Sequence, residues 1–137
     1  MKIYLANTGS GTHYEELFTG LKLEIEKFNG KPHDYNAQWF REKKYACDFL
    51  LYIFDPLFDN LFSIAELIDD AIKYPEKTLF CLNDVCDKKS FSKHQKKSLL
   101  TTGKMVVNNK ARCFEDVNAM LAFFRSVQFE HKKNQRQ

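Results

Sequence analysis

Apolar runs along this chain of 137 residues have the lengths and compositions of β-strands. The run FLLYIF, residues 49–54, shows no alternation, which is typical of a strand covered on both faces, and six residues are too few to cross a membrane. The strand predicted from this run also includes Asp48, the residue before it. The sequence predicts strands over residues 2–6, 31–35, 48–54, 78–82 and 111–114.

The segments between these runs carry apolar residues at intervals of three to four, the period of a helix with one buried face. The sequence predicts helices over residues 13–28, 36–46, 63–74, 91–109 and 115–127, with a strand over 105–107 as an alternative. In 63–74 the predicted core face is formed by Ile64, Leu67, Ile68, Ala71 and Ile72. The opposite, polar face is formed by Glu66, Asp69, Asp70 and Lys73.

Both ends of the first predicted helix have the sequence signals of helix termini. Thr12 and Glu15 have the spacing of a capping box, and Asn29-Gly30 is a helix-stopping pair. Because strands alternate with helices along the chain, the fold class is α/β, with a five-stranded, mostly parallel sheet covered by helices on both faces.

Length and charge indicate one domain with a nearly neutral folded part. Residues 1–130 form one predicted domain, and 131–137 (HKKNQRQ) has the composition of a solvated or disordered basic tail. The net charge is +3, and two of those charges come from the tail region, so charge does not indicate nucleic-acid binding. Residues 1–9 (MKIYLANTG) lack the long apolar segment of a signal peptide or membrane anchor.

The four cysteines have neither the spacing of paired metal ligands nor a disulfide framework. Cys47 and Cys81 adjoin or lie within apolar strands, and Cys86 and Cys113 are isolated. They are interpreted as thiols of a reducing compartment, which predicts a cytoplasmic protein without a bound metal.

The loops after the first and third strands should meet at one edge of the sheet, where open α/β sheets bind ligands. The first loop, NTGSGT, contains Asn7, Gly9, Ser10 and Gly11 before a predicted helix start. Free N–H groups at such a start can hold a phosphate or a sugar hydroxyl. The motif matches neither a P-loop nor a dinucleotide fingerprint, so a plain tight turn is an equal interpretation.

The second loop carries Asp55 and Asp59 and leads to Glu66, predicted in the first turn of its helix. A helix start favours a charged carboxylate by roughly 0.3–1 kcal/mol, and a carboxylate in a dry pocket is the nucleophile used against an anomeric carbon. Ser63 and Glu66 also have the spacing of a capping box, which the residues alone favour over catalysis. For the two aspartates, the simpler interpretation is a solvated turn.

Several segments together resemble the nucleoside 2-deoxyribosyltransferase-like family. They are DFLLYIFDP, FSIAELIDDAIKYPEKTLFCL, FSKHQKKSL and CFEDVNAMLAFF, supported by the opening MKIYLA. The resemblance covers most of the chain from Tyr35 onward. It implies a flavodoxin-like fold and an enzyme that moves or releases a 2-deoxyribosyl group at a nucleobase, without a cofactor.

The family's functional residues map onto named positions of this chain. The nucleophilic glutamate falls on Glu66, and the first-strand tyrosine that orients it falls on Tyr4. The family's aspartate six residues before the nucleophile is Asn60 here, so the acid that protonates the leaving base is expected to be Asp59. Asp34 and Asp55 stay open as alternatives.

The expected partner is a small nucleoside or nucleotide, contacted by the first loop, Asp55, Asn60 and Ser63. The resemblance also implies self-association, because family members complete their sites with a neighbouring subunit's residues. One alternative is hydrolysis of a 2′-deoxynucleoside 5′-phosphate by the same carboxylate. The other is a nucleotide-binding module without activity, since fold does not fix function.

Overall fold

A five-stranded parallel sheet forms the centre of the domain. The computed structural model describes residues 1–6, 13–27, 36–86 and 88–135. The strand order is β2-β1-β3-β4-β7, which is the flavodoxin-like order. The direction in which successive strands are added to the sheet reverses between β1 and β3. The strands are β1 (Lys2–Leu5), β2 (Glu24–Lys27), β3 (Phe49–Phe54), β4 (Thr78–Leu82) and β7 (Arg112–Phe114).

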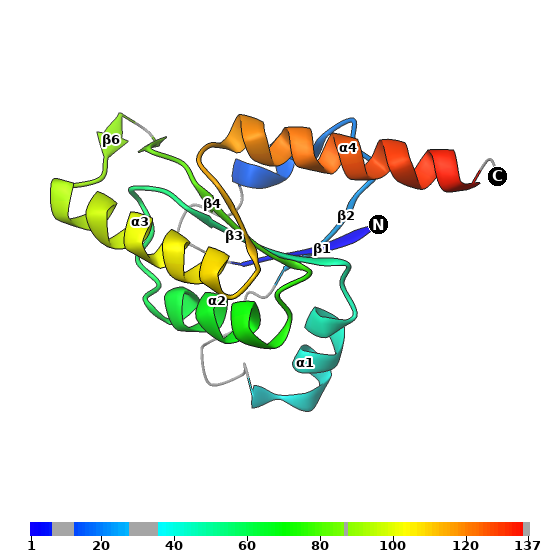
Figure 1. Cartoon of the computed structure of the whole chain (residues 1–137), viewed down its shortest axis with the longest axis horizontal. Coiled ribbons are helices and arrows are strands. Elements are labelled where there is room, and N and C mark those ends of the chain that lie inside the picture. The colour runs from blue at the N-terminus through cyan, green and yellow to red at the C-terminus, as the bar shows by residue number, and fades with distance from the viewer. Residues whose placement is uncertain (7–12, 28–35, 87, 136–137) are drawn as a thin grey trace.

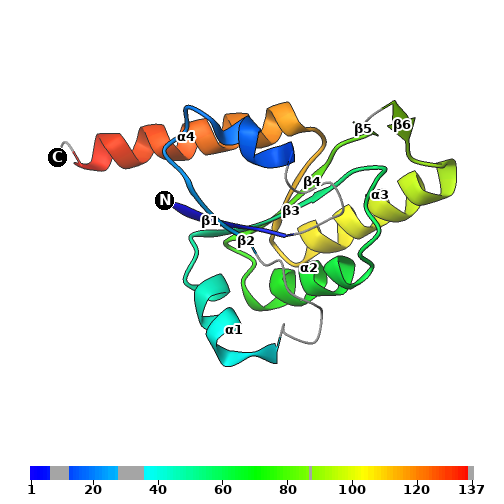
Figure 2. The ribbon, with the colours of Figure 1, turned by 180° about the vertical axis from the view of Figure 1, so that it is seen from behind.

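Helices cover both faces of this sheet. The helical segments are the 3-10 helix η1 (His13–Phe18), α1 (Gln38–Tyr45), α2 (Phe62–Lys73), α3 (Lys93–Asn108) and α4 (Val117–Gln135). Figure 1 shows α4 and η1 above the sheet and α1, α2 and α3 below it, and Figure 2 shows the same layers from behind. The predicted α/β fold with helices on both faces is therefore confirmed.

Successive side chains of the buried strands point to opposite faces of the sheet, so the domain has one hydrophobic core on each face. Tyr4, Tyr52 and Phe54 point to the face that α1, α2 and α3 cover. Ile3 and Leu51 belong to the cluster on the face of η1 and α4. A β3 strand that is buried on both sides explains why its sequence is continuously apolar.

The first predicted helix, over residues 13–28, is wrong. The structure has only η1, then Gly20 at φ +90°, and then strand β2, which pairs in parallel with β1. Leu21, Leu23 and Ile25 alternate with polar residues, which is the period of a strand rather than of a helix. The predicted caps Thr12, Asn29 and Gly30 lie outside the described residues, as does the predicted strand over 31–35.

The later elements lie within a few residues of their predicted bounds, except that α4 ends eight residues beyond the predicted residue 127. α3 begins after Ser92, which forms a capping box with Gln95, and the helix includes 105–107, so the alternative strand there is wrong. Gly103 lies inside α3, where an added Cβ would meet Cys113 Sγ at 3.0 Å. This glycine lets α3 approach β4 and β7 closely.

Two features near the ends of helices were not expected from the sequence. A short antiparallel hairpin, β5 (Val85–Cys86) with β6 (Lys89–Ser90), precedes α3. α4 continues to Gln135, so the segment predicted as a solvated or disordered tail is helical over residues 131–135. None of the helices in the described ranges is long and apolar enough to cross a membrane.

Candidate active site

Glu66 extends from α2 toward the sheet face on which Tyr4 lies. Tyr4 of β1 pairs in register with Leu50 of β3, and Tyr52 lies two residues further along β3, so both tyrosines point to this face. Glu66 and Asp70 are four residues apart on α2 and therefore share the helix face that packs on the sheet. The fold thus brings two carboxylates and two phenols together.

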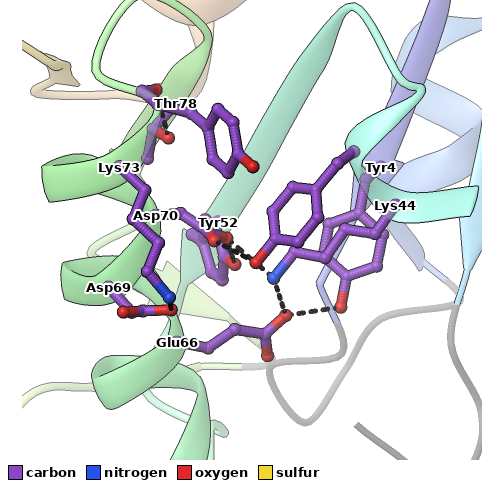
Figure 3. A network of polar contacts seen from close by, with 10 residues as sticks. Tyr4, Lys44, Tyr52, Glu66, Asp69, Asp70, Lys73 and Thr78 are labelled. Atoms are coloured by element: carbon purple, nitrogen blue, oxygen red, sulfur yellow. Dashed lines mark hydrogen bonds and ion pairs between the residues drawn. The ribbon is translucent and has the colours of Figure 1, made fainter. Parts of the chain in front are cut away.

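The Glu66 carboxylate receives two donors on one oxygen. Tyr4 Oη donates a hydrogen bond to Oε1 at 2.8 Å, and Lys44 Nζ of α1 lies 2.7 Å from the same atom. Glu66 is 6% exposed. Figure 3 shows its second oxygen turned away from Lys44 and Tyr4. The predicted pair of Tyr4 and Glu66 is brought together by the structure.

Lys44 joins Glu66 to a second carboxylate, that of Asp70. Lys44 Nζ lies 2.7 Å from Asp70 Oδ2, and the lysine and aspartate side chains are both 0% exposed. Tyr52 Oη donates a short hydrogen bond to Asp70 Oδ2, and Tyr45 Oη donates to Oδ1 at 3.0 Å. Asp70 therefore has a partner on each oxygen. We call these six residues, Tyr4, Lys44, Tyr45, Tyr52, Glu66 and Asp70, the lysine cluster.

Aromatic rings surround the Lys44 ammonium. Nζ lies 5.1 Å from the ring centre of Tyr4, 5.2 Å from that of Tyr45 and 5.9 Å from that of Tyr52. Burial lowers the pKa of Lys44, but the attraction of Glu66 and Asp70 outweighs burial and leaves that pKa above its usual value of 10.5. The lysine is thus held in its charged form.

The carboxylates of the lysine cluster outnumber its cations. Burial, followed by the charges of Glu66 and Asp70, raises the pKa of Tyr52 well above 10, so the phenol stays neutral. One ammonium then faces two carboxylates. A buried site with a surplus carboxylate charge can attack an electrophilic carbon or stabilise a cation.

Two interpretations of α2 made from the sequence are wrong. The helix begins at Phe62, has Leu61 as N-cap without a side-chain cap and has no acidic residue in its first turn. Glu66 therefore lies one turn further in, and it contacts Tyr4 and Lys44 rather than forming a capping box with Ser63. Glu66 and Asp70, predicted on the polar face, are buried, and Ile72, predicted in the core, is 60% exposed.

Asp55 forms a second buried polar group after β3 and is not a solvated turn residue. It is 0% exposed, accepts a short hydrogen bond from Tyr14 Oη, and accepts another from the Leu57 N–H at 2.7 Å. Asn83, which follows β4, donates to Tyr14 Oη at 3.1 Å. These contacts join the carboxyl ends of β3 and β4 to η1.

The remaining predicted site residues differ in how the structure places them. Asp59 is exposed, and the described chain records no contact between it and Glu66. Asn60 Oδ1 accepts from the Phe62 N–H at 3.2 Å, and Ser63 is buried at the start of α2. Asn7, Gly9, Ser10, Gly11 and Asp34 lie outside the described residues.

Sequence reasoning missed Lys44 and its neighbours Tyr45, Tyr52 and Asp70 as site residues. A lysine in a short amphipathic helix is normally solvated, so its type gave no signal. The signal that was present is the i, i+4 spacing of Glu66 and Asp70, which places two carboxylates on one helix face and calls for a cation opposite them. Within the described ranges, no group of three or more His, Cys, Asp or Glu side chains could hold a metal ion.

Comparison with protein-family models, with curated proteins and with solved structures found no match to this chain. The resemblance to deoxyribosyltransferases therefore stays an expectation, and a function has to be argued from the geometry of Glu66 and its neighbours.

Proposed function

We propose that this protein transfers a 2-deoxyribosyl group between nucleobases, with Glu66 as the nucleophile. The observation that carries the proposal is the hydrogen bond from Tyr4 to Glu66 Oε1 in a nearly buried site at the sheet face. The family resemblance implies the same contact, in which Tyr4 orients the nucleophilic glutamate. It joins residues 62 positions apart in sequence, so it does not follow from local structure.

In the first step Glu66 Oε2 attacks C1′ of a deoxynucleoside. An ester bond forms between this oxygen and C1′ while the bond from C1′ to the base nitrogen breaks. The electron pair of the broken bond stays on the base, which takes a proton from Asp59. The contacts of Tyr4 and Lys44 to Oε1 support the choice of Oε2, because they fix the carboxylate and occupy its other oxygen.

The charge of the lysine cluster suits this step. Glycosidic bond cleavage passes through a transition state with positive charge on the sugar. Two carboxylates around one ammonium leave a negative charge that attracts such a cation. Lys44 at the same time compensates enough charge to keep both carboxylates inside the protein.

In the second step another nucleobase attacks C1′ and displaces the Glu66 carboxylate. The proton of the attacking nucleobase passes to Asp59, and this restores the starting state of both side chains. Two displacements at one carbon give retention of configuration. If water attacks instead, the products are free base and deoxyribose, or deoxyribose 5-phosphate when the substrate is the 2′-deoxynucleoside 5′-phosphate of the hydrolytic alternative.

A purely structural role is the second candidate, and it has an observation of its own. Every charge of the lysine cluster has a partner inside the protein, as also happens in buried ion pairs without catalytic function. On this account the chain is a binding module, and replacing Glu66 changes stability but removes no turnover.

A cytoplasmic location and self-association belong to the same proposal. Cys47, Cys81 and Cys113 are thiols rather than disulfides, which fits a reducing compartment. Leu61, the N-cap of α2, and Ile72 of α2 are 73% and 60% exposed, and exposed apolar side chains of this size suit a contact between copies.

The proposal is tested by incubating purified protein with deoxyinosine and free adenine and measuring deoxyadenosine by chromatography. We expect deoxyadenosine with the natural chain and a loss of at least roughly a thousandfold in Glu66→Gln. Glu42→Gln is the matched control, because Glu42 is an exposed carboxylate on α1. Absence of product with every purine and pyrimidine pair, together with release of no free base, would sink the proposal.

A further inference from the structure

The near-zero net charge of the chain is the sum of two unequal parts. Residues 88–112 contain eight Lys and Arg and no Asp or Glu, whereas the other residues contain thirteen basic and eighteen acidic side chains. This segment therefore carries +8 within a chain of net charge +3. The total charge, from which no nucleic-acid partner was expected, conceals this separation.

The basic residues of this segment lie at the surface. Six exposed lysines have no ion pair with a carboxylate in the part of the chain that the structure describes: Lys88, Lys89, Lys93, Lys97, Lys104 and Lys110. Lys96 pairs with Asp84, which precedes the segment. We call the six lysines the basic surface.

The lysines of α3 follow one line along the helix. Lys93, Lys97 and Lys104 are spaced by four and seven residues, so they share a helix face. This face is opposite Leu99 and Val106, which are buried against the sheet. The three lysines span about 17 Å along the helix axis.

The β5–β6 hairpin adds two lysines near the start of this helix. Lys88 and Lys89 belong to the hairpin, which precedes α3 in the chain, and Figure 1 shows β6 beside the first turn of α3. Lys110 follows the opposite end of α3, two residues after Asn108. The lysines of α3 themselves form an elongated row within the basic surface, as a linear polyanion requires.

We propose that the basic surface binds the phosphate backbone of duplex nucleic acid without reading its sequence. Lysines in a row along a helix are point charges that neutralise phosphates. Large exposed aromatic side chains, on which unpaired bases stack, are Trp39 and Phe129 in the described ranges, and these belong to α1 and α4. The chemistry of the surface thus suits a duplex better than a single strand.

A membrane surface fits the same residues less well. A helix that lies in a bilayer interface needs a continuous apolar face to insert. The apolar face of α3 is buried against the sheet, and its exposed apolar side chains are limited to Leu100 and Val107, which are seven residues apart, and Met105 on another side of the helix. The positive charge of the lysines is therefore the feature of this surface that attracts a partner.

The test is the salt dependence of binding to a fluorescent DNA duplex of about 20 base pairs, measured by anisotropy. Each lysine that contacts a phosphate contributes about −0.9 to the slope of log K against log salt. For the natural chain we expect affinity to fall at least about a hundredfold between 50 and 200 mM salt. The triple variant Lys93→Gln, Lys97→Gln, Lys104→Gln should have a slope shallower by two to three.

A second triple variant, Lys22→Gln, Lys43→Gln, Lys132→Gln, is the matched control, because it removes the same charge from exposed lysines elsewhere. It should bind like the natural chain. Circular dichroism checks that both variants are folded. Equal losses in the two variants, no binding at 50 mM salt, or tighter binding to phosphatidylserine vesicles than to the duplex would each overturn the proposal. Deoxyribosyl transfer is measured separately and does not depend on these results.

Discussion

Lys44 and Glu66, which come from different helices, form an ion pair with 2.7 Å between Nζ and Oε1 in an almost fully buried site. The pair connects α1 to α2 across the face of β1, and Asp70 extends it one helical turn further along α2. Because charges are costly to bury, each partner depends on the other for its stability in the folded state.

The first prediction concerns the stability that Lys44 supplies. Lys44→Met removes the ammonium and leaves two buried carboxylates facing each other, so we expect the free energy of unfolding to fall by about 3–5 kcal/mol. Urea unfolding followed by circular dichroism measures it. Lys43→Met is the control, since Lys43 is exposed on the same helix and its loss should cost no more than about 0.5 kcal/mol. Equal effects of the two changes would show that the buried pair contributes no special stability.

The second prediction separates positioning of Glu66 from general stability. Tyr4→Phe removes the hydrogen bond to Glu66 Oε1, so we expect kcat to fall roughly tenfold or more, while the free energy of unfolding falls by about 1 kcal/mol. Tyr45→Phe makes the same chemical change at Asp70 and should leave kcat nearly unchanged. Steady-state kinetics of deoxyribosyl transfer measures both. A similar kcat in the two variants would contradict the role given to Tyr4.

The third prediction is a loss of stability in alkaline solution. The pKa of Lys44 is raised above 10.5 and that of Tyr52 well above 10, so the folded chain keeps protons that the unfolded chain releases. Burial likewise raises the pKa of Cys47 from 9.0 to about 11 and that of Cys81 to about 12. All four groups favour the folded state below about pH 9 and lose this contribution as the pH rises.

Urea unfolding at several pH values between 7 and 11 measures this loss. These four groups add no pH dependence to the free energy of unfolding near pH 7, because they are protonated in both states. The free energy of unfolding should decline above about pH 9. Tyr52→Phe should make the decline less steep, because one of the four groups is removed. A free energy of unfolding that rises between pH 9 and 11 would contradict this prediction.

The fourth prediction concerns the reactivity of Cys81. Its thiol is buried in β4 and has a pKa raised to about 12, so very little thiolate is present at pH 8. Alkylation with iodoacetamide followed by peptide mass mapping should leave Cys81 unmodified in the native protein and modify it in urea. Fast modification under native conditions would mean that β4 is not covered as described.

The sequence was most informative where burial alone decides the structure. Residues 78–82 were predicted as a strand with the bounds that the structure shows, because all five are buried. The run at 49–54 was predicted equally well, since its lack of alternation reflects cover on both faces. Where two periods competed, after Phe18, the helical interpretation of Leu21 and Ile25 was wrong and strand β2 was missed.

The candidate site was predictable only in part, because its chemistry depends on contacts between distant elements. Tyr4 and Glu66 were expected as partners from the family resemblance, and the structure shows their hydrogen bond. Lys44 and Asp70 were assigned no role, since isolated charged residues on helices are normally solvated. The i, i+4 spacing places Asp70 on the helix face of Glu66, but the burial of Lys44 and Asp70 follows from the packing of α1 against α2 over the sheet, which that spacing does not reveal.

The most direct test of the central claim is to trap the sugar on Glu66. A 2-fluoro-substituted arabinosyl nucleoside slows the second displacement, because the fluorine destabilises the positive charge on the sugar, so the glycosyl-enzyme accumulates. Intact-mass analysis and peptide mapping should find one fluorosugar per chain, attached at Glu66, and none on Glu66→Gln. A sugar attached at another residue, or free base released with no covalent adduct, would contradict Glu66 as the nucleophile.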